Sequence, residues 1–159
     1  MPFYYDTHLE TTTNGSGSTE SEHLRFQSVA NQESARIVAL YGSCIFGTAG
    51  GAKLRIKTAS SIGSGGTSQT PAKRNPSNPA AGLTAFNDGS ALTAGTGTVT
   101  ERLAIGMAQT GGLGAWVALE PSAGLTLLPN GGANGNAEVW SEANAASVPI
   151  DITVEHAEG

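Results

Sequence analysis

Cysteine is nearly absent from this sequence, since Cys44 is the only one among 159 residues. A single cysteine cannot form a disulfide within the chain. A structural zinc site needs three or four ligands, commonly paired at short spacing, and Cys44 with His8, His23 and His156 shows no such pairing. We therefore predict no metal site, and we expect Cys44, which has apolar neighbours, to be a buried small hydrophobic residue.

Charge is also scarce. Charged residues make up 13% of the chain, about half of the roughly 25% found in soluble domains. The net charge is -5, and every basic residue lies between Arg25 and Arg102. Nucleic-acid binding requires a net basic surface, so we expect no nucleic-acid partner. Two interpretations of the uneven charge stay open: the two halves pair across a subunit contact, or they solvate different faces.

Long apolar runs are missing. No segment approaches the roughly 20 apolar residues of a membrane-spanning helix. The start, Met1–Tyr5, has no basic region followed by an apolar run, so we expect no membrane partner and synthesis in the cytoplasm. A chain of 159 residues is long enough for one domain that buries its core without a metal or disulfides.

Catalytic motifs are missing as well. The sequence has no G-x-S-x-G motif, and the glycine clusters Gly63–Gly66 and Gly112–Gly114 do not complete a phosphate-binding loop. The three histidines lie in the terminal segments, where we expect too little rigidity for general-base catalysis. We predict no catalytic residues, no cofactor and no enzymatic activity.

Short β-type runs separated by glycine-rich turns are what the sequence does contain. Arg36–Tyr41 is a continuous apolar run, and Ala52–Lys57 alternates so that Leu54 and Ile56 face inward and three cations face outward. We predict that these two runs form a hairpin over the turn Gly47–Gly51.

The remaining runs lie after residue 98. Val148–Glu155 alternates strictly, with Pro149 suited to a strand start or an edge. About eight short strands predict an all-β fold of two packed antiparallel sheets, a β-sandwich of jelly-roll type. Trp116 and Trp140 fall within such runs, and we expect core packing rather than a sugar-binding platform. The other runs are Val99–Ala108, Leu113–Leu119, Leu125–Leu128 and Ala137–Trp140.

Two segments lack this pattern. Residues 1–22 join an aromatic tip, Phe3, Tyr4 and Tyr5, to a polar spacer, which predicts an extended N-terminal arm or tether. The tip would bind either a neighbouring subunit or this domain's own sheet. Residues 59–98 have almost no apolar anchors, which predicts a long central loop that lies on a neighbour or is disordered without a role. The β-sandwich domain would span residues 23–159.

Five segments resemble one family of proteins in their composition and short sequence phrases: Ala35–Gly42, Thr48–Lys57, Gly65–Pro76, Gln109–Pro121 and Val148–Glu155. Together they resemble small virion structural proteins of tailed bacteriophages, over about residues 35–158. The resemblance implies a capsid decoration (cement) protein with a jelly-roll-like β fold, located on the capsid surface. It further implies a homotrimer that binds the major capsid protein and stabilises the phage head by bridging its subunits.

Residues in the expected N-terminal arm and in the expected central loop fit this expectation. Phe3, Tyr4 and Tyr5 would be hydrophobic anchors of the kind that dominate interface energetics. Lys73 and Arg74 could pair with capsid carboxylates. The alternative is a neck-associated, tail-associated or receptor-binding (carbohydrate-binding) jelly-roll protein of the virion.

Overall fold

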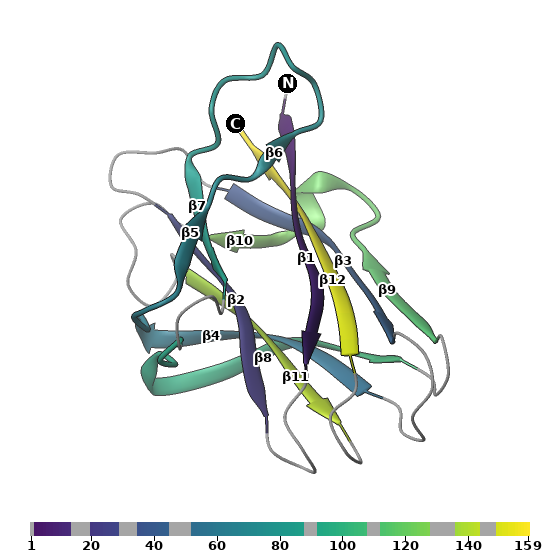
Figure 1. Ribbon diagram of the computed structural model, residues 1–159. Coiled ribbons are helices and arrows are strands. Elements are labelled where there is room, and N and C mark those ends of the chain that lie inside the picture. The colour runs from purple at the N-terminus through teal and green to yellow at the C-terminus, as the bar shows by residue number, and fades with distance from the viewer. Residues whose placement is uncertain are drawn as a thin grey trace.

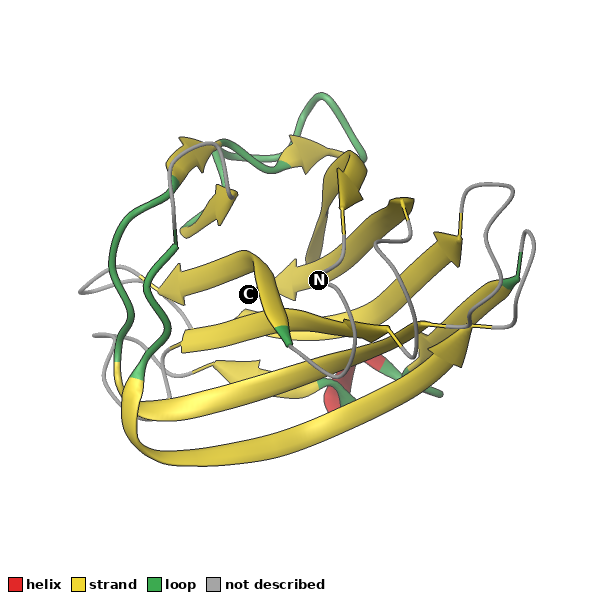
Figure 2. Ribbon diagram, turned by 60° about the horizontal axis from the view of Figure 1, so that its bottom comes forward, coloured by secondary structure: helices red, strands yellow, loops and turns green. Residues whose placement is uncertain are grey.

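The computed structural model describes residues 2–13, 20–28, 35–44, 52–87, 92–107, 112–127, 136–143 and 149–159. These residues are almost all β-strand, with one short 3-10 turn, η1 (Figure 2). The elements are β1 (Phe3–Thr13), β2 (Ser21–Ser28), β3 (Ala35–Cys44), β4 (Ala52–Ser61), β5 (Thr67–Gln69), β6 (Ala72–Lys73), β7 (Leu83–Asn87), β8 (Thr96–Met107), β9 (Leu113–Val117), η1 (Pro121–Ala123), β10 (Leu125–Leu127), β11 (Asn136–Ala143) and β12 (Pro149–Glu158).

The strands form two antiparallel sheets (Figure 1). Sheet A has the order β10-β3-β12-β1-β6, and β9 continues the β10 edge by pairing with the other half of β3. Sheet B has the order β5-β7-β2-β11-β4-β8. When the short strands β5, β6 and β7 are left out, consecutive strands lie in different sheets, with two exceptions. β4 and β8 both lie in sheet B, and β9 and β10 both lie in sheet A. This is the double Greek-key order of a jelly roll, so the predicted fold class is confirmed.

The core lies between the sheets and follows the alternation of the sequence. Leu54 and Ile56 of β4 are fully buried. On β12 the same holds for Ile150, Ile152 and Val154, and burying each such side chain stabilises the fold by about 1.5–3 kcal/mol. Both strands therefore bury the face that the sequence predicted. The cations of β4 lie on the opposite, outer face of sheet B: Lys53, Arg55 and Lys57. Cys44 is buried, as predicted.

The predicted hairpin of β3 and β4 is wrong. β3 pairs with β9, β10 and β12 in sheet A, whereas β4 pairs with β8 and β11 in sheet B. The two strands instead face each other across the core. A Cβ atom on Gly42 of β3 would lie only 2.4 Å from Leu54 Cδ1 of β4, so glycine is needed there for close packing. The expected turn, Gly47–Gly51, lies outside the described residues.

Residues 3–13 form strand β1 rather than the predicted arm. β1 pairs with β12 from Phe3↔Glu158 to Thr13↔Pro149 and lies between β12 and β6, so both chain ends meet beside β6 (Figure 1). Tyr5 and Thr7 are buried, and Asp6 between them faces outward. The sequence does not show this alternation, because the inward-facing residue Thr7 is polar. Residues 14–19 of the expected spacer lie outside the described residues.

The expected long loop, residues 59–98, is an insertion with its own strands. β4 continues to Ser61 and β8 begins at Thr96. Between them, β7 and β5 extend sheet B next to β2, while β6 extends sheet A next to β1. The insertion thus widens both sheets at the same side of the sandwich. Its strands are only two to five residues long, too short to give a periodic signal.

Arg25 ties this insertion to the outer face of sheet B. It is 2% exposed, and its Nη1 and Nη2 donate to the carbonyls of Ser64 and Gly65 at 2.9 and 2.6 Å. Its guanidinium also lies 5.0 Å from the ring centroid of Phe86. Gly65 and Gly66 have φ values of 75° and 86°, which glycine adopts without strain. The glycine cluster is therefore a turn that presents carbonyls to an arginine.

Among the described residues, no helix is long and apolar enough to cross a membrane.

Candidate partner-binding surfaces

A pocket of about 460 Å³ opens where the start of β1 meets the segment after β6. We call it the corner pocket. Phe3 and Tyr4 line it from β1, and Arg74 lines it from the insertion. Phe3 is 40% exposed and Tyr4 is partly buried, so aromatic surface is available to a partner here. The other lining residues are Pro2, Asn75, Ser77 and Asn78.

Four hydrogen bonds that each involve a backbone group hold the far wall of the corner pocket in place. The carbonyl of Tyr4 accepts from Arg74 N at 3.2 Å and from Asn78 Nδ2 at 3.3 Å. Asn75 closes the turn, because its side-chain oxygen accepts from Ser77 N at 3.0 Å and its carbonyl accepts from Asn78 N at 2.9 Å. Such Asx-type turns fix a loop without apolar contacts. The pocket is therefore organised within this chain.

Arg74 is held by two carboxylates of sheet A. Its Nε donates to Asp6 Oδ1 and Oδ2 at 3.0 and 3.1 Å, and its Nη2 pairs with Glu155. Burial alone would lower the pKa of Arg74, but the hydrogen bonds and charges of Asp6 and Glu155 outweigh it and raise the pKa. Arg74 thus forms part of the pocket wall. A carboxylate of a capsid protein would bind Arg74 only in addition to Asp6 and Glu155.

Tyr5 fits the alternative in which the aromatic tip packs on this domain's own sheet. It is 0% exposed, its ring stacks on His156, and its hydroxyl donates to the Pro79 carbonyl at 3.1 Å. Burial, followed by the charge of Glu158, raises the pKa of Tyr5. Alternation along β1 places Tyr5 inward and its neighbours outward. Tyr5 therefore belongs to the core of this chain, whereas Phe3 keeps an exposed ring.

Lys73 completes the set of predicted residues. It pairs with Tyr5 in the β6–β1 ladder, and its side chain is exposed, with no ion pair within the described part of the chain. The structure thus gathers Phe3, Tyr4, Lys73 and Arg74 at one corner. Sequence reasoning missed the Asn75–Asn78 wall, for which the only signal is the turn-forming pair Asn75-Pro76.

A second surface lies at the opposite edge of sheet A, on β9. Leu113, Val117 and the following Leu119 are 72%, 55% and 101% exposed. Within the described chain, β9 forms a ladder only with β3, so it is an edge. No charged residue occurs between Arg102 and Glu120, whereas edge strands usually carry charges or proline that block pairing with other chains. We call this surface the apolar edge; the sequence predicted its strand but not its exposure.

The outer face of sheet B carries a charge network within the chain. Arg55 pairs with Glu101, Glu142 and Glu20, and Lys57 pairs with Glu20. The ammonium of Lys57 also lies 4.8 Å from the ring centroid of Trp140. These acids and bases come from both halves of the chain, so part of the uneven charge is paired internally.

One carboxylate beside this network, that of Glu22, has no hydrogen-bond partner among the described residues. Both oxygens of Glu22 are buried without a hydrogen bond in the described structure. Burial, then the charge of Glu138, raises the pKa of Glu22 to about 7, and Arg25 opposes this only in part. Glu138 itself is satisfied, because it accepts from Gly95 N at 2.7 Å and from Trp140 Nε1 at 3.0 Å.

The tryptophans and histidines all lie in strands of this fold. Trp116 packs against the core, as predicted, whereas Trp140 lies on the outer face of sheet B rather than in the core. The histidines lie in strands rather than in mobile ends. His23 Nε2 is 2.5 Å from Ser141 Oγ, His8 Nδ1 is 2.8 Å from Thr153 Oγ1, and His156 stacks on Tyr5.

Comparison with known proteins assigns no family to this chain. No protein-family model matches this chain, and no curated protein matches it significantly. Within the described residues, no group of three or more His, Cys, Asp or Glu side chains could hold a metal ion. The resemblance to tailed-bacteriophage structural proteins therefore stays a prediction, and the two surfaces of sheet A are the features on which a function can be argued.

Proposed function

We propose that this protein is a non-enzymatic structural component of a tailed-bacteriophage virion. In this proposal it decorates the capsid surface and stabilises the head by bridging subunits of the major capsid protein. The observation that carries the proposal is that both edges of sheet A bear features suited to protein contact, the corner pocket at β6 and the apolar edge at β9. A domain with a contact at each edge can join two neighbours, and several weak contacts combine into strong attachment.

The two edges suit different partners. The corner pocket offers an exposed aromatic ring, Phe3, beside the exposed cation of Lys73, which fits a capsid surface with an apolar group and a carboxylate. Aromatic and charged residues of this kind commonly dominate binding energy. The apolar edge has no charge to complement, so it fits a second uncharged surface. We assign it to the contact between copies in a homotrimer.

Capsids prepared without this protein provide the test. The purified chain should cosediment with them, and the double variant Phe3→Ala/Lys73→Glu should bind roughly tenfold more weakly or worse, the loss expected when one anchor of about 1.4 kcal/mol or more is removed. The double variant Leu113→Ser/Val117→Ser should shift the mass in sedimentation equilibrium from trimer to monomer.

Val99→Ser is the matched control, because Val99 is 48% exposed on β8 but belongs to neither edge surface. It should change neither capsid binding nor the sedimentation mass. The proposal would be contradicted if the wild-type protein did not cosediment with the capsids. It would also be contradicted if the edge variants, like Val99→Ser, changed neither capsid binding nor the sedimentation mass.

A receptor-binding role has one observation in its favour. A hollow of about 190 Å³ on the outer face of sheet A combines the ring of Tyr41 with polar groups of His8, Asp151 and Thr153. An aromatic surface with a few convergent polar groups suits a small polar ligand such as a saccharide. For this alternative, host-surface glycans should shift the NMR signals of these residues, and Tyr41→Ala should abolish the shifts. Absence of any glycan-induced shift would exclude this role.

A further inference from the structure

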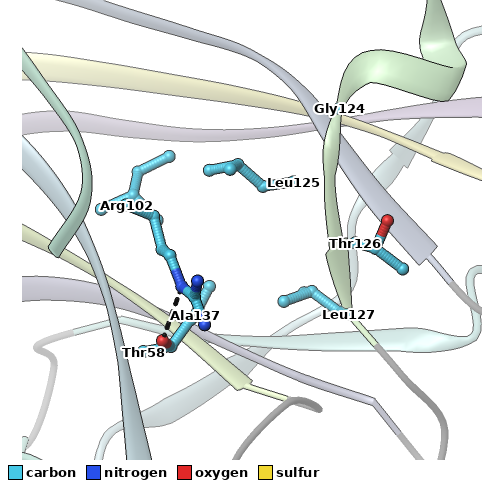
Figure 3. Close-up of a pocket in the computed structure, with 8 residues that line it drawn as sticks. Thr58, Arg102, Gly124, Leu125, Thr126, Leu127 and Ala137 are labelled. Atoms are coloured by element: carbon cyan, nitrogen blue, oxygen red, sulfur yellow. Dashed lines mark hydrogen bonds between the residues drawn. The ribbon is translucent and has the colours of Figure 1, made fainter. Parts of the chain in front are cut away.

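A separate pocket of about 210 Å³ opens between the two sheets, at the end where β10 of sheet A faces β4, β8 and β11 of sheet B (Figure 3). Its inner wall is apolar and is formed by Ile56, Leu125, Leu127 and Ala137. Leu127 and Ile56 are buried core residues, and Leu125 is partly buried against the core. An opening into the core of a small domain, lined in this way, accepts an apolar group.

One cation, Arg102, forms the opposite wall of this pocket. In the β4–β8 ladder Ile56 pairs with Leu103 and Lys57 pairs with Glu101, so Arg102 is the extra residue of a β-bulge. Bulges redirect side chains out of the regular alternation. Figure 3 shows the Arg102 side chain facing Leu125 and Leu127 across the pocket.

The guanidinium of Arg102 is held in place but not neutralised. Its Nε donates to Thr58 Oγ1 at 3.1 Å, which fixes the plane of the group. Its two Nη atoms have no hydrogen-bond or ion-pair partner in the described part of the chain, and the adjacent Glu101 pairs with Arg55 instead. Two parallel N–H donors of one guanidinium match the two oxygens of a carboxylate.

We propose that this pocket binds a small monocarboxylate with an apolar tail. The carboxylate accepts hydrogen bonds from Arg102, and the tail lies against Leu125, Leu127 and Ile56. The size agrees with this ligand class, because an apolar cavity of about 150 Å³ holds benzene, so a pocket of about 210 Å³ holds a chain of six to eight carbons. The site shares no residue with the corner pocket or with the exposed leucines and valine of the apolar edge, and it does not rest on the proposed virion function.

Titration of the full chain with octanoate, followed by NMR, tests the site. Octanoate should shift the signals of the pocket residues in a saturable manner, with a Kd of about 1 mM or tighter. Acetate, which lacks the tail, and octylamine, which has the opposite charge, should bind much more weakly. No saturable shift with octanoate, or equal binding of octylamine, would overturn the proposal.

Variants separate the two halves of the site. Arg102 is exposed, so Arg102→Gln should fold normally and bind octanoate roughly tenfold more weakly, the loss expected for one charged hydrogen-bonded pair. Leu125→Phe fills the pocket and should abolish binding. Lys53→Gln, which removes one exposed positive charge from β4, is the control and should leave affinity unchanged. Undiminished binding by Arg102→Gln would refute the assignment.

Discussion

The ring of Tyr5 stacks on the imidazole of His156, with ring centroids 5.1 Å apart and ring planes 16° apart. This pair joins β1 to β12, the first and last strands of the chain, in the core of the sandwich. The aromatic residues at the start of the chain therefore have two roles. Tyr5 stabilises the fold, whereas Phe3 lies at the surface and is free to contact a partner.

Tyr5→Ala is expected to destabilise the protein by about 3 kcal/mol or more, because it leaves a cavity in the core. Tyr5→Phe removes only the hydrogen bond to Pro79 and should cost about 1 kcal/mol. Phe3→Ala, at an exposed site two residues away, should change stability by less than about 0.5 kcal/mol. Urea unfolding of the three variants measures these differences. Equal losses for Tyr5→Ala and Phe3→Ala would contradict the placement of β1.

Glu22 should make stability fall as pH rises. Its pKa in the folded state is about 7, above the ordinary value of 4.5. Between these values the unfolded chain has lost a proton that the folded chain still holds, so the free energy of unfolding decreases as pH increases through this window. Glu22 as a whole residue is only partly buried, so solvent screening reduces the effect below that of the full shift.

Glu22→Gln removes this penalty and should raise Tm at pH 8 by roughly 2–4 °C, the shift that about 1 kcal/mol produces in a domain of this size. At pH 4 the variant and the wild type should unfold at similar temperatures. Glu10→Gln, at an exposed position of β1, is the control. A variant that is less stable than wild type at pH 8 would show that Glu22 has a stabilising partner when ionised.

Glu158 should act in the opposite direction. Burial would raise its pKa, but hydrogen bonds from His156 and from the backbone N–H groups of Gly82 and Leu83, at 3.1, 2.7 and 2.9 Å, lower it. The stabilisation is therefore present above the unfolded-state pKa and is lost as pH falls through the lowered value. Glu158→Gln should lower Tm at pH 7 and have a much smaller effect at pH 3; the reverse order in a thermal melt would contradict this.

Arg25→Met should loosen the insertion selectively. The variant removes the donors to Ser64 and Gly65 while keeping an unbranched apolar side chain. Limited trypsin digestion should then cut after Lys73 or Arg74 several-fold faster than in wild type, because local opening controls cleavage of folded chains. Lys53→Met provides the matched control. Equal acceleration at all sites would indicate global destabilisation and reject a local anchoring role.

The sequence predicted those strands in which one face is buried and the other is solvated. β12 alternates Ile150 and Ile152 with Asp151 and Thr153, and a period of two assigns each residue to a face. The same reasoning failed at β1, since Thr7 is polar but buried. The pairing of strands also escaped prediction, because β1 pairs with β12 at the far end of the chain, and alternation says nothing about partners.

The sequence likewise predicted some residues of the candidate sites and missed others. Composition pointed to Phe3, Tyr4, Lys73 and Arg74, which the fold brings to one corner. Arg102 gave no signal, because its orientation depends on a β-bulge set by the β4–β8 register, which no local pattern encodes. The apolar edge depends on β9 being an edge strand, which is a property of the sheet order.

Cryo-electron microscopy of the purified virion that carries this protein tests the central proposal most directly. The account predicts density repeated across the capsid lattice that fits the sandwich, with the corner pocket against the major capsid protein and the apolar edge between copies. Capsids that carry no such density, or density confined to the neck or tail, would contradict the decoration role.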